Sequence, residues 1–230
     1  MTFGAGKYVA VSPNAFSVSS NATAWANTAH NLGALTAVTH DGTQFVTVGA
    51  AGRIATSPDG LSWTTQTSST TTALRSVAAG AGTLIAVGDT GLILRSTNAG
   101  VTWASQTIPA SVSSNAQLLA ATYAGGQFVI VGFASAGGAG ATIILTSPDG
   151  AAWTRSDVPY SMSARAITYT GSRYLVGGGT STILTSADAV TWTAETANNA
   201  QAVMSVKDAQ ELLTLQASLF QPLAEKTVAY

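Results

Sequence analysis

The sequence has 230 residues, of which 46% are hydrophobic and 8% are charged, and it contains no cysteine. This length allows one substantial core, and the lack of cysteine excludes disulfides, thiolate catalysis and cysteine-based metal sites. A formal net charge of −1 without a run of Lys or Arg gives no electrostatic surface for nucleic acid. The longest apolar stretches, 127–131 and 142–145, are too short to cross a membrane.

Metal and cofactor sites are not expected. The two histidines, His30 and His40, lie in expected connections between strands, where contact with solvent is the simplest interpretation. No third ligand accompanies them, so the sequence predicts neither a metal nor a cofactor. Residues 1–7 lack a basic stretch followed by an apolar one, and a secretory signal is therefore not expected.

All five tryptophans occur in one repeating register. The spacings between successive tryptophans are 38, 40, 50 and 39 residues. A Ser–Asp or Ser–Asn turn sequence precedes each of them, as in Ser57-Pro-Asp-Gly-Leu-Ser-Trp63. Upstream of Trp63, three short apolar segments at 35–38, 44–48 and 53–56 are separated by turn residues, and the next unit repeats this order. Self-similarity at such a period predicts a repeat architecture.

Each unit is predicted to form four short strands. Four strands in roughly 40 residues is typical of one blade of a β-propeller. The turn before the tryptophan has a local mechanism, because the Asp carboxylate and Ser hydroxyl accept nearby amide protons and Gly tolerates a positive φ. This turn places the following tryptophan on the fourth strand, where its large side chain is expected to be buried between neighbouring blades.

These turn sequences resemble the Asp-box, or BNR repeat, of sialidases and of photosystem assembly-factor-like propellers, and shorter variants are found in bacterial and phage proteins. Ser96-Thr-Asn-Ala-Gly-Val-Thr-Trp103 is similar to the full-length motif, with Asn98 in place of Asp, and the other four copies are one residue shorter. The resemblance implies an all-β propeller. It assigns structural roles to Trp25, Ser57, Asp59, Trp63, Ser96, Asn98, Trp103, Ser147, Asp149, Trp153, Ser186, Asp188 and Trp192.

The predicted propeller spans residues 1–206 and has five blades. The first unit lacks an obvious first strand, and 202–206 resembles one, so we expect the C-terminal strand to complete the N-terminal blade. Residues 207–230 then form a C-terminal extension. A capping-box-like start at Asp208 favours a helix, and a degenerate sixth blade is the alternative. The extension carries a dense apolar cluster predicted to attach the propeller to a partner: Leu212, Leu215, Leu219 and Phe220.

Enzymatic activity is not expected. The sialidase resemblance would imply an arginine triad, a Tyr/Glu pair and an Asp acid–base, but only six arginines are present and the Arg-Ile-Pro signature is missing. Other glycosidases require a pair of carboxylates. Asp59, Asp149 and Asp188 are assigned to turns. The remaining candidates for such a pair are Asp41, Asp89 and Asp157.

The ten extra residues between Trp103 and Trp153 fall in two long connections, 107–117 and 133–141. Both belong on the propeller face that carries the connections between blades, and insertions in repeat proteins tend to map to the binding face. The side chains there are small and uncharged, which favours a flat contact surface. The residues predicted to contribute to binding are Thr107, Ser111, Asn115, Phe133, Ser135 and Gly138.

A charge-poor composition that looks extracellular, without an export signal, favours a protein released by lysis. We therefore expect a non-enzymatic interaction propeller of a phage virion, such as a tail, fibre-associated or head-decoration protein. Its partners would be other virion proteins, with surface glycan as a further possibility. The alternatives are a carbohydrate-binding, lectin-like propeller and a sialidase-like glycosidase, located in the bacterial cytoplasm or at the cell surface.

Overall fold

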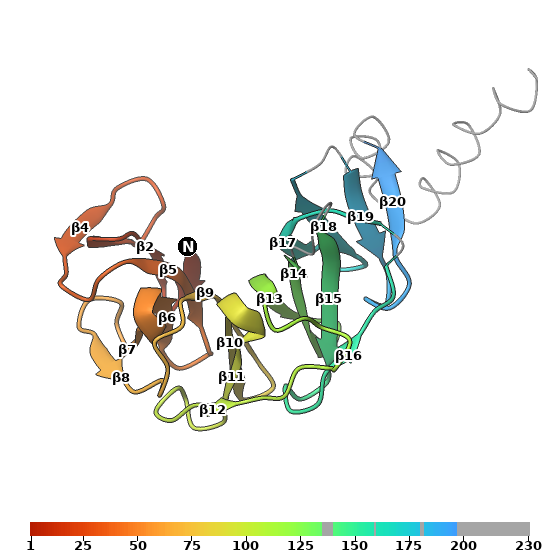
Figure 1. Ribbon diagram of the computed structural model, residues 1–230. Helices are drawn as coiled ribbons and strands as arrows, with labels where there is room; N and C mark the ends of the chain where they lie inside the picture. The colour runs from red at the N-terminus through yellow and green to blue at the C-terminus, as the bar shows by residue number, and fades with distance from the viewer. Residues whose placement is uncertain (135–139, 159, 180–181, 197–230) are drawn as a thin grey trace, which may run out of the picture.

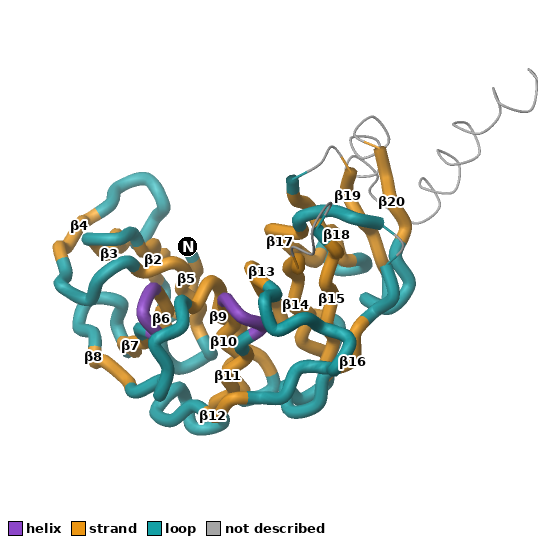
Figure 2. The backbone as a smooth tube through the Cα atoms, in the orientation of Figure 1, coloured by secondary structure: helices purple, strands orange, loops and turns teal. Residues whose placement is uncertain are grey.

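A computed structural model describes residues 1–134, 140–158, 160–179 and 182–196. These residues form five antiparallel sheets of four strands, and in each sheet the strands follow one another in chain order. Figures 1 and 2 show the sheets following one another along an arc, with the first and fifth sheets at its two ends. The prediction of an all-β propeller with five four-stranded blades is confirmed.

The strand boundaries agree closely with the repeat in the sequence. The first sheet contains β1 (Thr2–Gly4), β2 (Lys7–Val11), β3 (Ala15–Ser19) and β4 (Ala26–Ala29). The second contains β5 (Leu35–His40), β6 (Phe45–Gly49), β7 (Ile54–Ser57) and β8 (Thr64–Gln66). The third contains β9 (Leu74–Gly80), β10 (Thr83–Gly88), β11 (Ile93–Ser96) and β12 (Ala104–Ser105).

The fourth sheet contains β13 (Gln117–Ala124), β14 (Gln127–Ala134), β15 (Ala141–Ser147) and β16 (Thr154–Arg155). The fifth contains β17 (Ala164–Tyr169), β18 (Tyr174–Gly178), β19 (Thr182–Ser186) and β20 (Thr193–Thr196). Two single 3-10 turns, η1 (Ala50–Gly52) and η2 (Asp89–Gly91), join the second and third strands of their sheets.

The expectation that the first unit lacks its first strand is wrong. β1 pairs with β2 through Thr2 opposite Val9 and Gly4 opposite Lys7, so the position reserved for 202–206 is already occupied. The two strands are joined by Ala5 and Gly6, both at positive φ, which is the geometry of a tight two-residue hairpin. A three-residue strand with no apolar repeat was not recognisable as a strand. Residues 202–206 and 207–230 lie outside the described residues.

Among the described residues the core is divided into four hydrophobic clusters, one at each junction between consecutive sheets. At the junction of the third and fourth sheets, Ile85 and Val87 pack against Phe128, Ile130 and Trp153. The second strands of the second, third and fourth sheets contribute to the clusters on both their sides, because alternate side chains of a strand point to opposite faces. This explains why the second strands are almost continuously apolar rather than alternating.

The five tryptophans lie directly before the fourth strand of their sheets rather than within it. Trp103, Trp153 and Trp192 are buried, with exposed fractions of 6–8%. Trp63 is half-buried and stacks on Phe16 of the first sheet at a ring-centroid distance of 4.4 Å. Trp25 is 37% exposed, because in the described part of the chain no sheet precedes the first one. Burial of the tryptophan between blades is therefore correct for the later sheets and wrong for the first.

The interpretation of His40 as a solvated turn residue is also wrong. His40 ends β5, and its ring lies so close to Gly4 of β1 that a Cβ atom on that glycine would meet the ring at 2.1 Å. Its ring also packs edge-on against Phe45. His40 is therefore part of the contact between the first two sheets.

None of the described helices is long and apolar enough to span a membrane.

Candidate binding face

The strand order places the connections of the arc on two faces. One face, here called the connection face, carries the turns between second and third strands and the segments that join one sheet to the next. Gly52 of η1 lies against Thr70, and Gly91 of η2 donates its N–H to the carbonyl of Ala116, 2.7 Å away. The other face, the turn face, carries the five Ser-x-Asp or Ser-x-Asn turns.

The first long connection on the connection face is a packed segment rather than a pliable surface. Val112 and Ala116 are 5% and 0% exposed and belong to the cluster between the third and fourth sheets. The side chain of Arg155 donates a hydrogen bond to the carbonyl of Ser111 and fastens the segment to β16. The predicted residues Thr107, Ser111 and Asn115 remain exposed.

The second long connection is described only in part. Phe133 is half-buried near the end of β14, and the guanidinium carbon of Arg165 lies 5.7 Å from the centre of its ring. This distance is within the range of a cation–π contact between the fourth and fifth sheets. Ser135 and Gly138 lie outside the described residues. A role in binding stays a prediction for all six residues of the two connections: Thr107, Ser111, Asn115, Phe133, Ser135 and Gly138.

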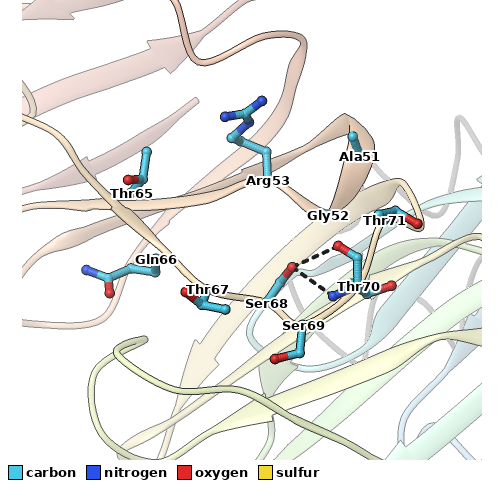
Figure 3. Close-up of a pocket in the computed structure, with 10 residues that line it drawn as sticks. All are labelled: Ala51, Gly52, Arg53, Thr65, Gln66, Thr67, Ser68, Ser69, Thr70 and Thr71. Carbon is cyan, nitrogen blue, oxygen red and sulfur yellow. Dashed lines mark hydrogen bonds between the residues drawn. The ribbon is translucent and has the colours of Figure 1, made fainter.

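A groove of about 720 Å³ lies on the connection face at the second sheet, not at the fourth. It is formed by η1, the outer strand β8 and the segment that leads to the third sheet (Figure 3). Its lining consists almost entirely of hydroxyl, amide and backbone groups with one guanidinium: Ala51, Gly52, Arg53, Thr65, Gln66, Thr67, Ser68, Ser69, Thr70 and Thr71.

The wall of the groove is held by local hydrogen bonds. The Ser68 hydroxyl donates to the carbonyl of Thr70 at 3.2 Å and accepts from the Thr70 N–H, as Figure 3 shows. A Cβ atom on Gly52 would lie 2.0 Å from the Thr70 carbonyl oxygen, so only glycine allows η1 to approach this segment. Sequence reasoning missed the groove, although a run of six Ser and Thr residues at 67–72 was a visible signal.

The turn face is built from one repeated hydrogen-bond pattern, which confirms the predicted mechanism. The Ser57 hydroxyl accepts the N–H of Gly60 at 2.8 Å, and one Asp59 carboxylate oxygen accepts the N–H groups of Leu61 and Ser62 at 2.9 Å. The Trp63 indole N–H then donates to the carbonyl of Gly60. The turns that begin at Ser19, Ser96 and Ser186 close in the same way.

These hydrogen bonds lower the pKa of three carboxyl groups. Backbone N–H donors at Ser62 and Leu61 lower the pKa of Asp59 from its ordinary value of 3.8. The Ala151 N–H has the same effect on the pKa of Asp149, and the Thr191 and Val190 N–H groups on that of Asp188. In the third sheet Asn98 takes the place of the aspartate, so that turn does not titrate.

The lowered pKa values predict a loss of stability in acid. A carboxyl group whose folded pKa lies below its unfolded value stabilises the fold above about pH 4 and loses this contribution as pH falls through the folded pKa. We expect the urea concentration at half-unfolding to decrease as the pH is lowered below about 4. The triple variant Asp59→Asn, Asp149→Asn and Asp188→Asn should flatten that decline, as measured by tryptophan fluorescence. An equally steep decline in the variant would contradict this assignment.

Two of the four remaining described carboxylates, Asp41 and Asp89, are also engaged in local structure. Asp41 accepts the N–H groups of Thr43 and Gln44 at 2.8 Å and closes its own turn. Asp89 forms a two-pronged ion pair with Arg75, at 2.9 Å and 2.6 Å. This pairing with Asp89 raises the pKa of Arg75. Within the described ranges no three His, Asp or Glu side chains gather as they would around a metal ion.

Comparison with known proteins agrees with this architecture. A family model described as the DUF6242 beta propeller domain matches residues 4–216. No curated protein matches the sequence. Among solved structures, YCF48 from Cyanidioschyzon merolae is 15% identical with a TM-score of 0.54, and the match covers 70% of this chain and 56% of that one.

Two further structures are similar to a comparable degree. YCF48 bound to D1 peptide is 15% identical with a TM-score of 0.59, covering 84% of this chain and 65% of that one. The WD40 β-propeller domain of Doa1 is 13% identical with a TM-score of 0.60, covering 80% and 62%. The chain thus spans 56–65% of the length of these propellers, and the likeness concerns the fold. With the family model covering most of its length, the chain belongs to the DUF6242 β-propeller domain family.

Proposed function

We propose that the chain is a non-enzymatic interaction propeller that serves as a structural component of a phage virion, in a tail, fibre or head decoration. The observation that carries the interaction role is the polar groove on the connection face, which offers hydroxyl, amide and guanidinium groups on a rigid support. A similar propeller, YCF48, is known bound to a peptide. The low charge and absence of cysteine support the virion context.

A non-catalytic role agrees with the state of five of the seven described carboxylates, the other two being Asp157 and Glu195. Each of Asp41, Asp59, Asp89, Asp149 and Asp188 is engaged by turn amides or by an arginine. A general acid–base pair requires two carboxyl groups that are free to reach a substrate. These five serve the fold, and the proposed function uses none of them.

The virion role is tested by the composition of purified particles. The chain should be present at a fixed number of copies per particle after gradient purification, as measured by quantitative mass spectrometry. It should remain bound through a high-salt wash, because the proposed attachment is apolar. Its absence from particles that assemble normally would overturn the proposal.

Attachment is proposed to occur through residues 207–230, which lie outside the described residues. Leu215→Glu combined with Phe220→Ser should prevent incorporation into particles, since exposed apolar clusters usually mark interaction sites. The melting temperature of the isolated chain should change little. A matched control is Leu61→Glu combined with Val190→Ser, at side chains 48% and 57% exposed. A large fall in melting temperature with attachment retained would contradict the assignment of residues 207–230 to attachment.

A lectin-like role is the second candidate, favoured by the many hydroxyl and amide groups of the groove. Such groups can form hydrogen bonds with sugar hydroxyls, and Arg53 adds a positive charge for an acidic sugar. A glycan array separates this role from a purely structural one. Glycan binding that is lost in the double variant Arg53→Ala, Gln66→Ala would support a lectin. An array on which the protein binds no glycan would favour the purely structural role.

A further inference from the structure

The four junctions between the sheets repeat one pair of complementary surfaces. The preceding sheet contributes aliphatic side chains of its second strand, such as Val46 and Val48. The following sheet contributes its tryptophan together with the large residue of its second strand that pairs with the turn serine, such as Trp103 with Leu84 opposite Ser96. Equivalent pairs, Phe128 with Trp153 and Tyr174 with Trp192, occupy the later junctions.

One kind of polar contact recurs at all four junctions. A long side chain of the preceding sheet donates a hydrogen bond to a carbonyl in the Ser-x-Asp turn of the following sheet. The four pairs are Lys7 to Asp59 at 3.2 Å, Gln44 to Ala99 at 2.6 Å, Arg95 to Asp149 at 3.0 Å and Gln127 to Asp188 at 2.9 Å. Three of the donors stand directly before the large residue that pairs with the turn serine, so this contact is part of the repeat.

The first sheet presents one half of this junction without a described sheet beside it. Tyr8 occupies the position of Phe45 and Tyr174, and it packs against Phe3 with ring centroids 4.6 Å apart. Phe3 is 56% exposed, and Trp25 is 37% exposed where the buried tryptophans are 6–8% exposed. The carbonyl of Asn21 is the counterpart of the acceptors at Asp59 and Asp188. We call Phe3, Tyr8, Asn21 and Trp25 the open face of the first sheet.

The fifth sheet presents the other half. Arg173 stands directly before Tyr174, at the position of Lys7, Gln44 and Gln127. Its side chain is half-buried and donates no hydrogen bond within the described part of the chain, where no further turn follows beyond β20. Leu175 and Ile183 correspond to Val129 and Ile144, which pack onto the next sheet at the fourth junction. Leu175 is 9% exposed and Ile183 is half-buried, whereas Val129 and Ile144 are both 0% exposed.

We infer that the open face of the first sheet is the docking surface for the fifth sheet of a second copy of this chain. In this contact Arg173 of one copy donates to the Asn21 carbonyl of the other, and Leu175 faces Tyr8 and Trp25. A second copy is the favoured occupant because the complementary surface already exists on the same chain, at the opposite end of the arc (Figure 1). A head-to-tail contact of this kind is heterologous, and two arcs joined at both ends close into a ring.

This inference does not depend on the virion role, and solution mass tests it directly. The full chain should sediment at twice its 23.1 kDa mass at micromolar concentration. Phe3→Glu and, separately, Arg173→Glu should each weaken dimerisation at least tenfold. Phe3→Glu places an unpaired charge in the apolar contact, and Arg173→Glu replaces the donor by a carboxylate that the Asn21 carbonyl repels. Val101→Glu is the matched control, because Val101 is 55% exposed but lies in the turn between β11 and β12 of the third sheet, and it should leave the dimer intact.

Site-directed crosslinking identifies the surfaces, because the chain has no cysteine of its own. A mixture of Ser20→Cys and Arg173→Cys chains should form a covalent dimer with a short bis-maleimide, and neither chain alone should do so. Lys7→Cys with Pro58→Cys, the equivalent positions of the first junction, should crosslink within one chain and calibrate the reach. A monomeric wild type would overturn the inference. A chain that carries both Ser20→Cys and Arg173→Cys provides a second check. An internal crosslink in this chain would also overturn the inference, because the first and fifth sheets of one molecule would then lie side by side.

Discussion

Trp103→Ala should lower the free energy of unfolding by about 3–5 kcal/mol, which is the usual cost of removing a large buried aromatic side chain. Trp103 is 8% exposed and packs among Val46, Leu84 and Leu94 at the second junction. Its indole N–H also donates to the carbonyl of Gly100 at 2.9 Å, so the substitution removes both the packing and the closing hydrogen bond of the turn.

The matched control is Trp25→Ala, which removes the same side chain from the equivalent turn of the first sheet. Trp25 is 37% exposed, and its indole N–H makes the same hydrogen bond, to the carbonyl of Ala22 at 3.1 Å. We expect a cost of about 1 kcal/mol for the monomeric chain, because little packing is lost. Urea titrations at low protein concentration measure both values. Equal costs would show that burial at the junction is not what stabilises the repeat.

Gly178→Ala should destabilise the chain by about 3 kcal/mol or more, because added volume has no room at this position. A Cβ atom there would lie 1.9 Å from the carbonyl oxygen of Ser163, which is backbone and cannot turn away. The same close approach recurs near the end of the second strand in the second, third and fourth sheets, where Gly49, Gly88 and Gly132 meet the carbonyls of Ala34, Ala73 and Gln117.

Gly177→Ala is the adjacent control in β18. No atom lies within 4 Å of a Cβ atom at this position, so the substitution should change the free energy of unfolding by less than about 1 kcal/mol. Thermal unfolding of the two variants followed by circular dichroism compares them directly. Similar melting temperatures would mean that the backbone at Ser163 shifts to admit a methyl group.

The local chemistry of the turns could be predicted from the sequence, because it depends on neighbouring residues. Ser57, Asp59 and Gly60 are within four positions of one another, and their hydrogen bonds follow from residue type and spacing. The strand boundaries were predictable for the same reason, since short apolar segments alternate with turn residues. β1 was the exception, because three residues carry no repeating pattern.

The position of the groove could not be predicted in this way. Loop length pointed to the fourth sheet, but Val112 and Ala116 anchor the long connection in the core. The groove instead arises where η1 approaches the segment near Thr70, which depends on Gly52 and on the course of the chain after β8. Contacts of this kind join residues whose relation appears only after the sheets have packed.

The sequence by itself determined the repeat, the strand order within each sheet and the turn that precedes each tryptophan, because all three arise from interactions within about 40 residues. Only the tertiary structure decided which copies of the repeat are covered. Trp25 and Trp192 stand in nearly the same local sequence, yet one is 37% exposed and the other 6%. The difference comes from the neighbouring sheet, because burial of apolar area at a junction requires two surfaces and a single repeat supplies only one.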